Sequence, residues 1–190
     1  MPRRIFIAIN LPEKIRKELY SFRDSYPDLP LRWTKKENLH LTLLFLGHVN
    51  DDELLNICDL VKEVGLQHAP FSLSLKRIVF GPPQKKPPRL IWVEGQASKK
   101  LARLQKDLES SLFENVTEDR DQETHGFRPH ITLARIKAWQ WHQLEPEEIP
   151  EIDKEISFTF LVESIEVMES ELKKEGPEYS VLESIPLGQK

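Results

Sequence analysis

The sequence predicts an α+β fold in which two mainly antiparallel sheets, with helices on the outside, enclose a central cleft. The first observation behind this prediction is a His-x-Thr-x motif that occurs twice, at His40 and at His130, each time within an apolar run of strand length. The second is the order of the expected elements, which is similar before and after a proline-rich segment at 81–88. Such a loose duplication predicts one domain with two lobes, approximately residues 1–80 and 89–190.

The first half begins with an apolar strand and continues as helix, strand, strand, helix and strand. Pro12 suits the first turn of the first helix, because its ring fixes a helical φ and its missing N–H costs nothing there. Gly47 is expected to end the strand that carries the first motif, and Asn50 to cap the second helix. The strands are predicted at 5–9, 31–33, 39–46 and 71–75, and the apolar helix faces at Ile15, Leu19 and Phe22 and at Leu54, Ile57, Cys58, Val61 and Val64.

The proline-rich segment is interpreted as the crossing between the two halves. A strand, a helix with leucines on one face and the strand of the second motif follow it, and further strands end the chain. Residues 115–126 are acidic and lack periodicity, which predicts a loop or a lid, and 137–155 is also expected to be a loop. The strands are predicted at 90–93, up to Ile136, and at 156–162, 165–168 and 179–185, and the helix face at Leu101, Leu104, Leu108 and Leu112.

Composition narrows the class of protein. The chain has 190 residues, of which 39% are hydrophobic and 31% charged, which is typical of a globular domain with one sizeable core. A net charge of −4 argues against binding long nucleic acid by bulk attraction, although it allows recognition of a single RNA end. Cys58 is the only cysteine, so an internal disulfide is excluded. The N-terminal apolar run is too short for a signal peptide or a membrane span, which predicts a cytoplasmic protein.

The two motifs carry the chemistry that the sequence predicts. Because side chains alternate along a strand, His40 and Thr42 point to one face at a spacing of roughly 6.5–7 Å, as do His130 and Thr132. One motif alone fits a structural histidine, whereas the repetition favours a shared site. Two imidazoles at one pocket supply a general acid and a general base near neutral pH, and two hydroxyls can donate to phosphate oxygens. No metal is expected, because the histidines lack the spacing of zinc ligands.

Both motifs and the segments around them resemble those of the two-histidine phosphoesterase superfamily, in particular its RNA 2′,3′-cyclic phosphodiesterase branch, also called 2′-5′ RNA ligase. The resemblance runs through nearly the whole chain in order. The matching segments are Arg3-Arg4-Ile5-Phe6-Ile7-Ala8-Ile9 with Leu11-Pro12, Leu31-Arg32-Trp33, Asn38-Leu39-His40-Leu41-Thr42-Leu43, Pro88-Arg89-Leu90-Ile91-Trp92, Phe127-Arg128-Pro129-His130-Ile131-Thr132-Leu133-Ala134-Arg135 and Gly176-Pro177-Glu178-Tyr179.

The resemblance implies two lobes related by a pseudo-twofold axis, with one motif in each. It also implies hydrolysis, without a cofactor, of 2′,3′-cyclic phosphates on RNA 3′ ends or nucleotides, to leave a 2′-phosphate. His40 would then be the general acid and His130 the general base, although the residues themselves leave this assignment symmetric. Two alternatives remain: a 2′-5′ RNA ligase that runs the reaction in reverse, and a nucleotide-binding module without turnover.

Residues near the motifs can be placed by the same alternation. Arg128 falls on the face of His130 and is the candidate for a further contact with the substrate. Arg135 and Phe45 fall on the opposite faces of their strands, so we expect Arg135 to be structural and Phe45 to lie in the core. Two groups of cations could line a path for RNA, although charged loop residues are more often only solvated, which is the interpretation we favour: Arg32, Lys35 and Lys36, and Lys85, Lys86 and Arg89. We expect the protein to be a monomer.

Overall fold

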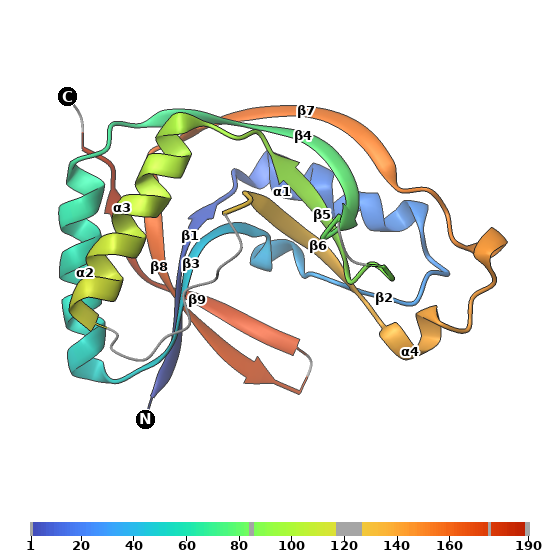
Figure 1. Ribbon diagram of the computed structural model, residues 1–190, viewed down its shortest axis with the longest axis horizontal. Coiled ribbons are helices and arrows are strands. Elements are labelled where there is room, and N and C mark those ends of the chain that lie inside the picture. The colour runs from blue at the N-terminus through green and yellow to red at the C-terminus, as the bar shows by residue number, and fades with distance from the viewer. Residues whose placement is uncertain (1, 84–85, 117–126, 175, 189–190) are drawn as a thin grey trace.

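The computed structural model describes residues 2–83, 86–116, 127–174 and 176–188, and its strands form two antiparallel sheets (Figure 1). The four-stranded sheet has the order β3-β1-β8-β9, and the five-stranded sheet has the order β2-β6-β5-β4-β7. The strands are β1 (Arg3–Asn10), β2 (Leu31–Trp33), β3 (His40–Val49), β4 (Phe71–Gly81), β5 (Leu90–Gly95), β6 (His130–Ile136), β7 (Asp153–Val162), β8 (Ser164–Lys173) and β9 (Gly176–Pro186). The α-helices are α1 (Glu13–Ser21), α2 (Asp51–Leu66), α3 (Lys99–Val116) and α4 (Ala138–Trp141).

The two sheets repeat one arrangement. β3 lies beside β1 and is followed across its sheet by β8 and β9, while β6 lies beside β5 and is followed by β4 and β7. In each sheet, the motif strand pairs with the strand that precedes a helix: β1 with α1, and β5 with α3. The predicted α+β class, with one motif in each of two antiparallel sheets, is therefore confirmed. β2 is an additional edge strand beside β6.

Each sheet takes strands from both halves of the chain. β8 and β9 complete the sheet that begins with β1 and β3, and β2 and β4 join the sheet of the second motif. The prediction that the proline-rich segment crosses between lobes is wrong, because this segment joins β4 to β5, which are neighbours in one sheet. Element order alone does not reveal which strands pair over long sequence separations.

Local signals set the ends of the first elements. Asn50 caps α2 as predicted: its Oδ1 accepts from the Glu53 N–H at 2.9 Å, and the Glu53 carboxylate accepts from the Asn50 N–H at 2.6 Å. Gly47 does not end its strand, since β3 continues to Val49 with Gly47 at φ 71° beside an irregularity in the pairing with β1. Glycine adopts this left-handed conformation without steric cost, so the strand bends there instead of stopping.

Other predicted boundaries moved as well. β4 and β7 are longer than predicted, and the expected loop at 137–155 contains the short helix α4. Most of the expected loop at 115–126 lies outside the described residues, apart from the end of α3. None of the helices in the described ranges is long and apolar enough to cross a membrane.

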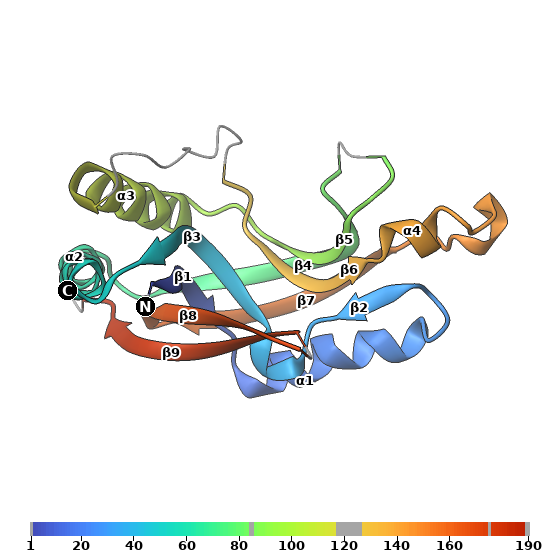
Figure 2. The ribbon, with the colours of Figure 1, turned by 90° about the horizontal axis from the view of Figure 1, so that it is seen from below.

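The described helices α2 and α3 cover one face of the four-stranded sheet. α2 and α3 lie side by side, and both views place them on the same side of β1 and β3 (Figures 1 and 2). Ile5, Ile7 and Ile9 of β1 join the main core with the helix residues, whereas Phe6 and Ala8 form a small separate cluster on the other face. We call the face of each sheet that carries its motif histidine the open face.

Candidate active site

Both motif strands contribute to one pocket of about 200 Å³. His40 and Thr42 line it from β3, and His130 and Thr132 line it from β6. The structure therefore brings together both histidines and both threonines that the sequence singled out. The other lining residues are Arg32, Trp33, Thr34, Lys35, Asn38, Phe45, Leu90, Arg135, Gly176, Pro177 and Tyr179.

The two imidazoles are held in the same way. The Nδ1 atom of His40 lies 2.8 Å from the backbone carbonyl of Asn38, and that of His130 lies 2.9 Å from the carbonyl of Arg128. A carbonyl can only accept, so each Nδ1 carries the proton and donates it. The Nε2 atom of each neutral ring is then left as the basic atom, and in His40 it lies 3.0 Å from the Thr42 hydroxyl.

Aromatic side chains support both rings. His40 packs against Phe6 and Tyr179, with ring centroids 5.0 and 5.2 Å away. His130 packs against Trp92 at 4.3 Å. These contacts help to fix the planes of the two imidazoles.

Burial makes His40 a poor holder of a proton in the free protein. The pKa of His40 is lowered to about 4, mainly by burial; the hydrogen bond to the Asn38 carbonyl opposes this shift, and a positive charge on His130 adds to it. His40 is therefore neutral at pH 7 in the free protein.

A β-bulge in each motif strand changes which residues reach the pocket. In β3 the pairing with β1 shifts between Thr42 and Leu44, and in β6 the pairing with β5 shifts between Thr132 and Ala134. Two consecutive residues are buried at each shift, so the next residue returns to the open face. The predictions for Phe45 and Arg135 are therefore wrong: both line the pocket, and Phe45 is 59% exposed.

Arg128 was predicted to contact the substrate, but its side chain does not lie in the pocket. Its side chain is exposed and does not line the pocket, while its carbonyl accepts the hydrogen bond that orients His130. Asn38 has the corresponding position before His40, and its buried side chain donates to the Pro177 carbonyl at 2.8 Å, which ties this segment to the start of β9.

The sequence-based predictions did not place the aromatic lining from other strands in the site, and they favoured a solvated role for Arg32. Tyr179 comes from β9, and Trp33 and Arg32 come from the edge strand β2. A regular alternation gives no signal for any of them, because they reach the pocket through strand pairings far apart in the sequence. Within the described ranges, no three His, Cys, Asp or Glu side chains gather as they would around a metal ion.

Comparison with known proteins gives a consistent set of relatives. A family model described as the 2′-5′ RNA ligase superfamily matches residues 11–174. A protein from Methanocaldococcus jannaschii is 30% identical over 181 residues, covering 94% of this chain and 98% of the relative. A protein from Thermus thermophilus is 31% identical, covering 97% of this chain and 90% of the relative. Both relatives are named RNA 2′,3′-cyclic phosphodiesterase.

Solved structures show the same fold. A crystal structure of a Thermus thermophilus protein superimposes with a TM-score of 0.84 at 30% identity, covering 98% of this chain and 100% of that chain. Escherichia coli LigT in complex with 3′-AMP superimposes with a TM-score of 0.78 at 26% identity, and both chains are covered completely. LigT has also been solved in complex with phosphate and with ATP.

Proposed function

Because the chain belongs to the 2′-5′ RNA ligase superfamily, we propose that it hydrolyses 2′,3′-cyclic phosphates at RNA ends to 2′-phosphates by metal-independent acid–base catalysis. One observation carries the proposal. His40 and His130 come from different sheets, reach one pocket, and are both oriented by a backbone carbonyl at Nδ1. This leaves two Nε2 atoms to exchange protons with a substrate.

The reaction forms a bond from a water oxygen to phosphorus and breaks the bond from phosphorus to the ribose 3′-oxygen. One Nε2 takes a proton from the attacking water, and the other donates a proton to the departing 3′-oxygen. The entering and leaving oxygens lie on opposite sides of phosphorus. Histidines on two separate strands, β3 and β6, suit such an in-line reaction better than two histidines on one strand would.

The pKa of His40 supports a division of roles. A ring that is neutral at pH 7 is ready to act as the base, so His40 takes the water proton and His130 protonates the leaving oxygen. This is the reverse of the assignment implied by the family resemblance. The negative phosphate raises the proton affinity of both rings when the substrate binds, which favours the protonated state that His130 needs.

The remaining lining residues suit the substrate. The hydroxyls of Thr42 and Thr132 can donate to the non-bridging oxygens, and the Arg135 guanidinium adds a cation on the side of His130. The exposed ring of Phe45 offers a surface on which a base can stack. Because the pocket has polar groups for a phosphate and an aromatic ring for a base, it suits a nucleotide better than inorganic phosphate.

A direct assay tests the proposal. The protein is incubated in EDTA with adenosine 2′,3′-cyclic phosphate, and the product is identified by phosphorus NMR. We expect adenosine 2′-phosphate; the absence of any hydrolysis would leave the nucleotide-binding module as the better account. A parallel reaction with RNA that has a 5′-hydroxyl tests the ligase alternative, which differs in that a ribose 5′-oxygen replaces water.

A further inference from the structure

The pocket holds more positive charge than one cyclic phosphate requires. Arg32, Lys35 and Arg135 all line it, while a cyclic phosphate diester carries one negative charge. Among the described residues, no Asp or Glu lines the pocket and none of the three cations has an ion pair. Arg135 alone can balance the reacting phosphate, so Arg32 and Lys35 are in excess.

Two of these cations are held side by side. Arg32 of β2 lies directly opposite Arg135 of β6 in the antiparallel ladder. Residues opposite each other have Cα atoms about 4.5–5.5 Å apart, and like charges at such positions destabilise a sheet. An anion between the two guanidinium groups removes the repulsion, so this pair is best explained as part of an anion site.

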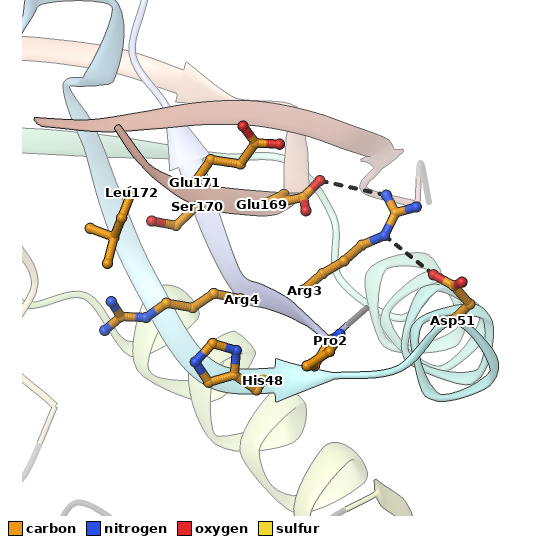
Figure 3. A pocket seen from close by; sticks show the side chains of 9 residues that line it. All are labelled: Pro2, Arg3, Arg4, His48, Asp51, Glu169, Ser170, Glu171 and Leu172. Atoms are coloured by element: carbon orange, nitrogen blue, oxygen red, sulfur yellow. Dashed lines mark ion pairs between the residues drawn. The ribbon is translucent and has the colours of Figure 1, made fainter. Parts of the chain in front are cut away.

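The charged residues of a second hollow are arranged differently from those of the active-site pocket. This hollow of about 540 Å³ lies at the other end of β1, and in it Arg3 is paired with Asp51 at 3.2 Å and with Glu169 at 3.5 Å (Figure 3). Glu171, which also lines it, is paired with Lys173 at 2.6 Å. In this hollow Arg3 and Glu171 are therefore neutralised within the chain, whereas the ion pairs of the described residues include neither Arg4 nor any of the three cations of the active-site pocket.

We propose that Arg32 and Lys35, next to Arg135, form a subsite for the phosphodiester on the 5′ side of the terminal nucleotide. Arg135 is the next open-face residue after Thr132, and Arg32 lies one strand further from the motif. A strand that enters over Arg32 therefore meets Arg135 and then the two threonines and histidines in order. The subsite makes an RNA end, with at least one internal phosphate, the preferred substrate over a free cyclic nucleotide.

This inference rests on the proposed function, and a comparison of three substrates tests the subsite and the proposed function separately. They are adenosine 2′,3′-cyclic phosphate, the same compound with a 5′-monophosphate, and the dinucleotide ApA that ends in a 2′,3′-cyclic phosphate. We expect kcat/KM to be at least about tenfold higher for the dinucleotide than for the nucleoside, because one charge-assisted contact is worth about that much. If the protein hydrolyses none of the three substrates, the proposed function itself is wrong.

Substitutions of Arg32 and Lys35 test their role in the subsite. Arg32→Gln and Lys35→Gln should each reduce the dinucleotide-to-nucleoside ratio of kcat/KM several-fold. For the dinucleotide, each should also lower the slope of log KM against log salt by about 0.7, the value for one lost phosphate contact on a single strand. Arg4→Gln is the matched control, because Arg4 is another exposed strand arginine and lies at the second hollow (Figure 3). It should leave both quantities unchanged.

Three results would overturn the subsite while leaving the proposed function intact. The first is a ratio near one in the unmodified protein. The second is an equal loss of the ratio in Arg4→Gln and Arg32→Gln, which would indicate a general effect of charge. The third is a 5′-monophosphate substrate that matches the dinucleotide, which would indicate a mononucleotide as the ligand instead of RNA.

Discussion

Phe45 and Arg135 occupy the same position in their two motif strands. Each is the third residue after the motif threonine, and each returns to the open face because a β-bulge buries the two residues between. The pocket therefore has an apolar ring on one side and a cation at the corresponding place on the other. A ribose phosphate between two nearly identical motifs meets unlike surfaces, so it can be held in one orientation.

We predict that Arg135→Gln lowers kcat/KM for a cyclic nucleotide by about 10- to 100-fold, since a charged hydrogen bond to phosphate is lost. Arg128→Gln is the matched comparison, because its side chain lies outside the pocket and its carbonyl is retained. It should stay within about threefold of the unmodified protein. A larger effect at Arg128 than at Arg135 would restore Arg128 as the contact with substrate.

Phe45→Ala should raise KM by about 5- to 100-fold through loss of base stacking, while Phe45→Tyr should retain most of the affinity. The same measurement with ribose 2′,3′-cyclic phosphate, which has no base, checks the cause. That compound should be nearly insensitive to the change at Phe45. Equal losses for both compounds would mean that Phe45 shapes the pocket instead of binding the base.

The low pKa of His40 predicts a dependence of stability on pH. A ring with a pKa near 6.5 when unfolded and about 4 when folded binds more protons in the unfolded state between these values. Its contribution to the free energy of unfolding is therefore complete above pH 6.5 and falls as the pH drops to 4. The decrease is at most about 3 kcal/mol, because residual contact with solvent reduces it. His40→Asn should remove this part of the pH dependence in urea unfolding. Identical pH profiles for the two proteins would contradict the shift.

A substrate with a better leaving group tests which histidine is the acid. The p-nitrophenyl diester of a 2′-deoxynucleoside 3′-phosphate releases p-nitrophenolate, which needs little help from an acid. We therefore expect His130→Ala to lose much less activity on this diester than on a cyclic phosphate, and His40→Ala to lose activity on both. The opposite pattern would assign the acid to His40, as the family resemblance implies.

The sequence predicted the centre of the site and the class of fold because these depend on local patterns. A His-x-Thr-x pair places both side chains on one strand face whatever the partner strand is. The repetition of the pair then predicted a shared pocket, which contains His40, Thr42, His130 and Thr132.

The surroundings of the site could not be predicted in the same way. A bulge adds one residue to a strand without a distinctive sequence, and it reversed the predicted faces of Phe45 and Arg135. Arg32 reached the pocket only because β2 pairs with β6, across about one hundred positions of sequence. The proline-rich segment was misinterpreted for a different reason: it connects β4 and β5, which pair directly with each other in one sheet.

In the proposed reaction, two imidazoles transfer both protons without a metal. The most direct test is the single-turnover rate of cyclic phosphate hydrolysis in EDTA for the unmodified protein, His40→Ala and His130→Ala. Each single variant should be slower by about 10² to 10⁴, or about 2.7 to 5.5 kcal/mol, and the double variant should lose much less than the sum, because the two rings act as a unit. A variant of either histidine that keeps nearly the full rate would contradict the account.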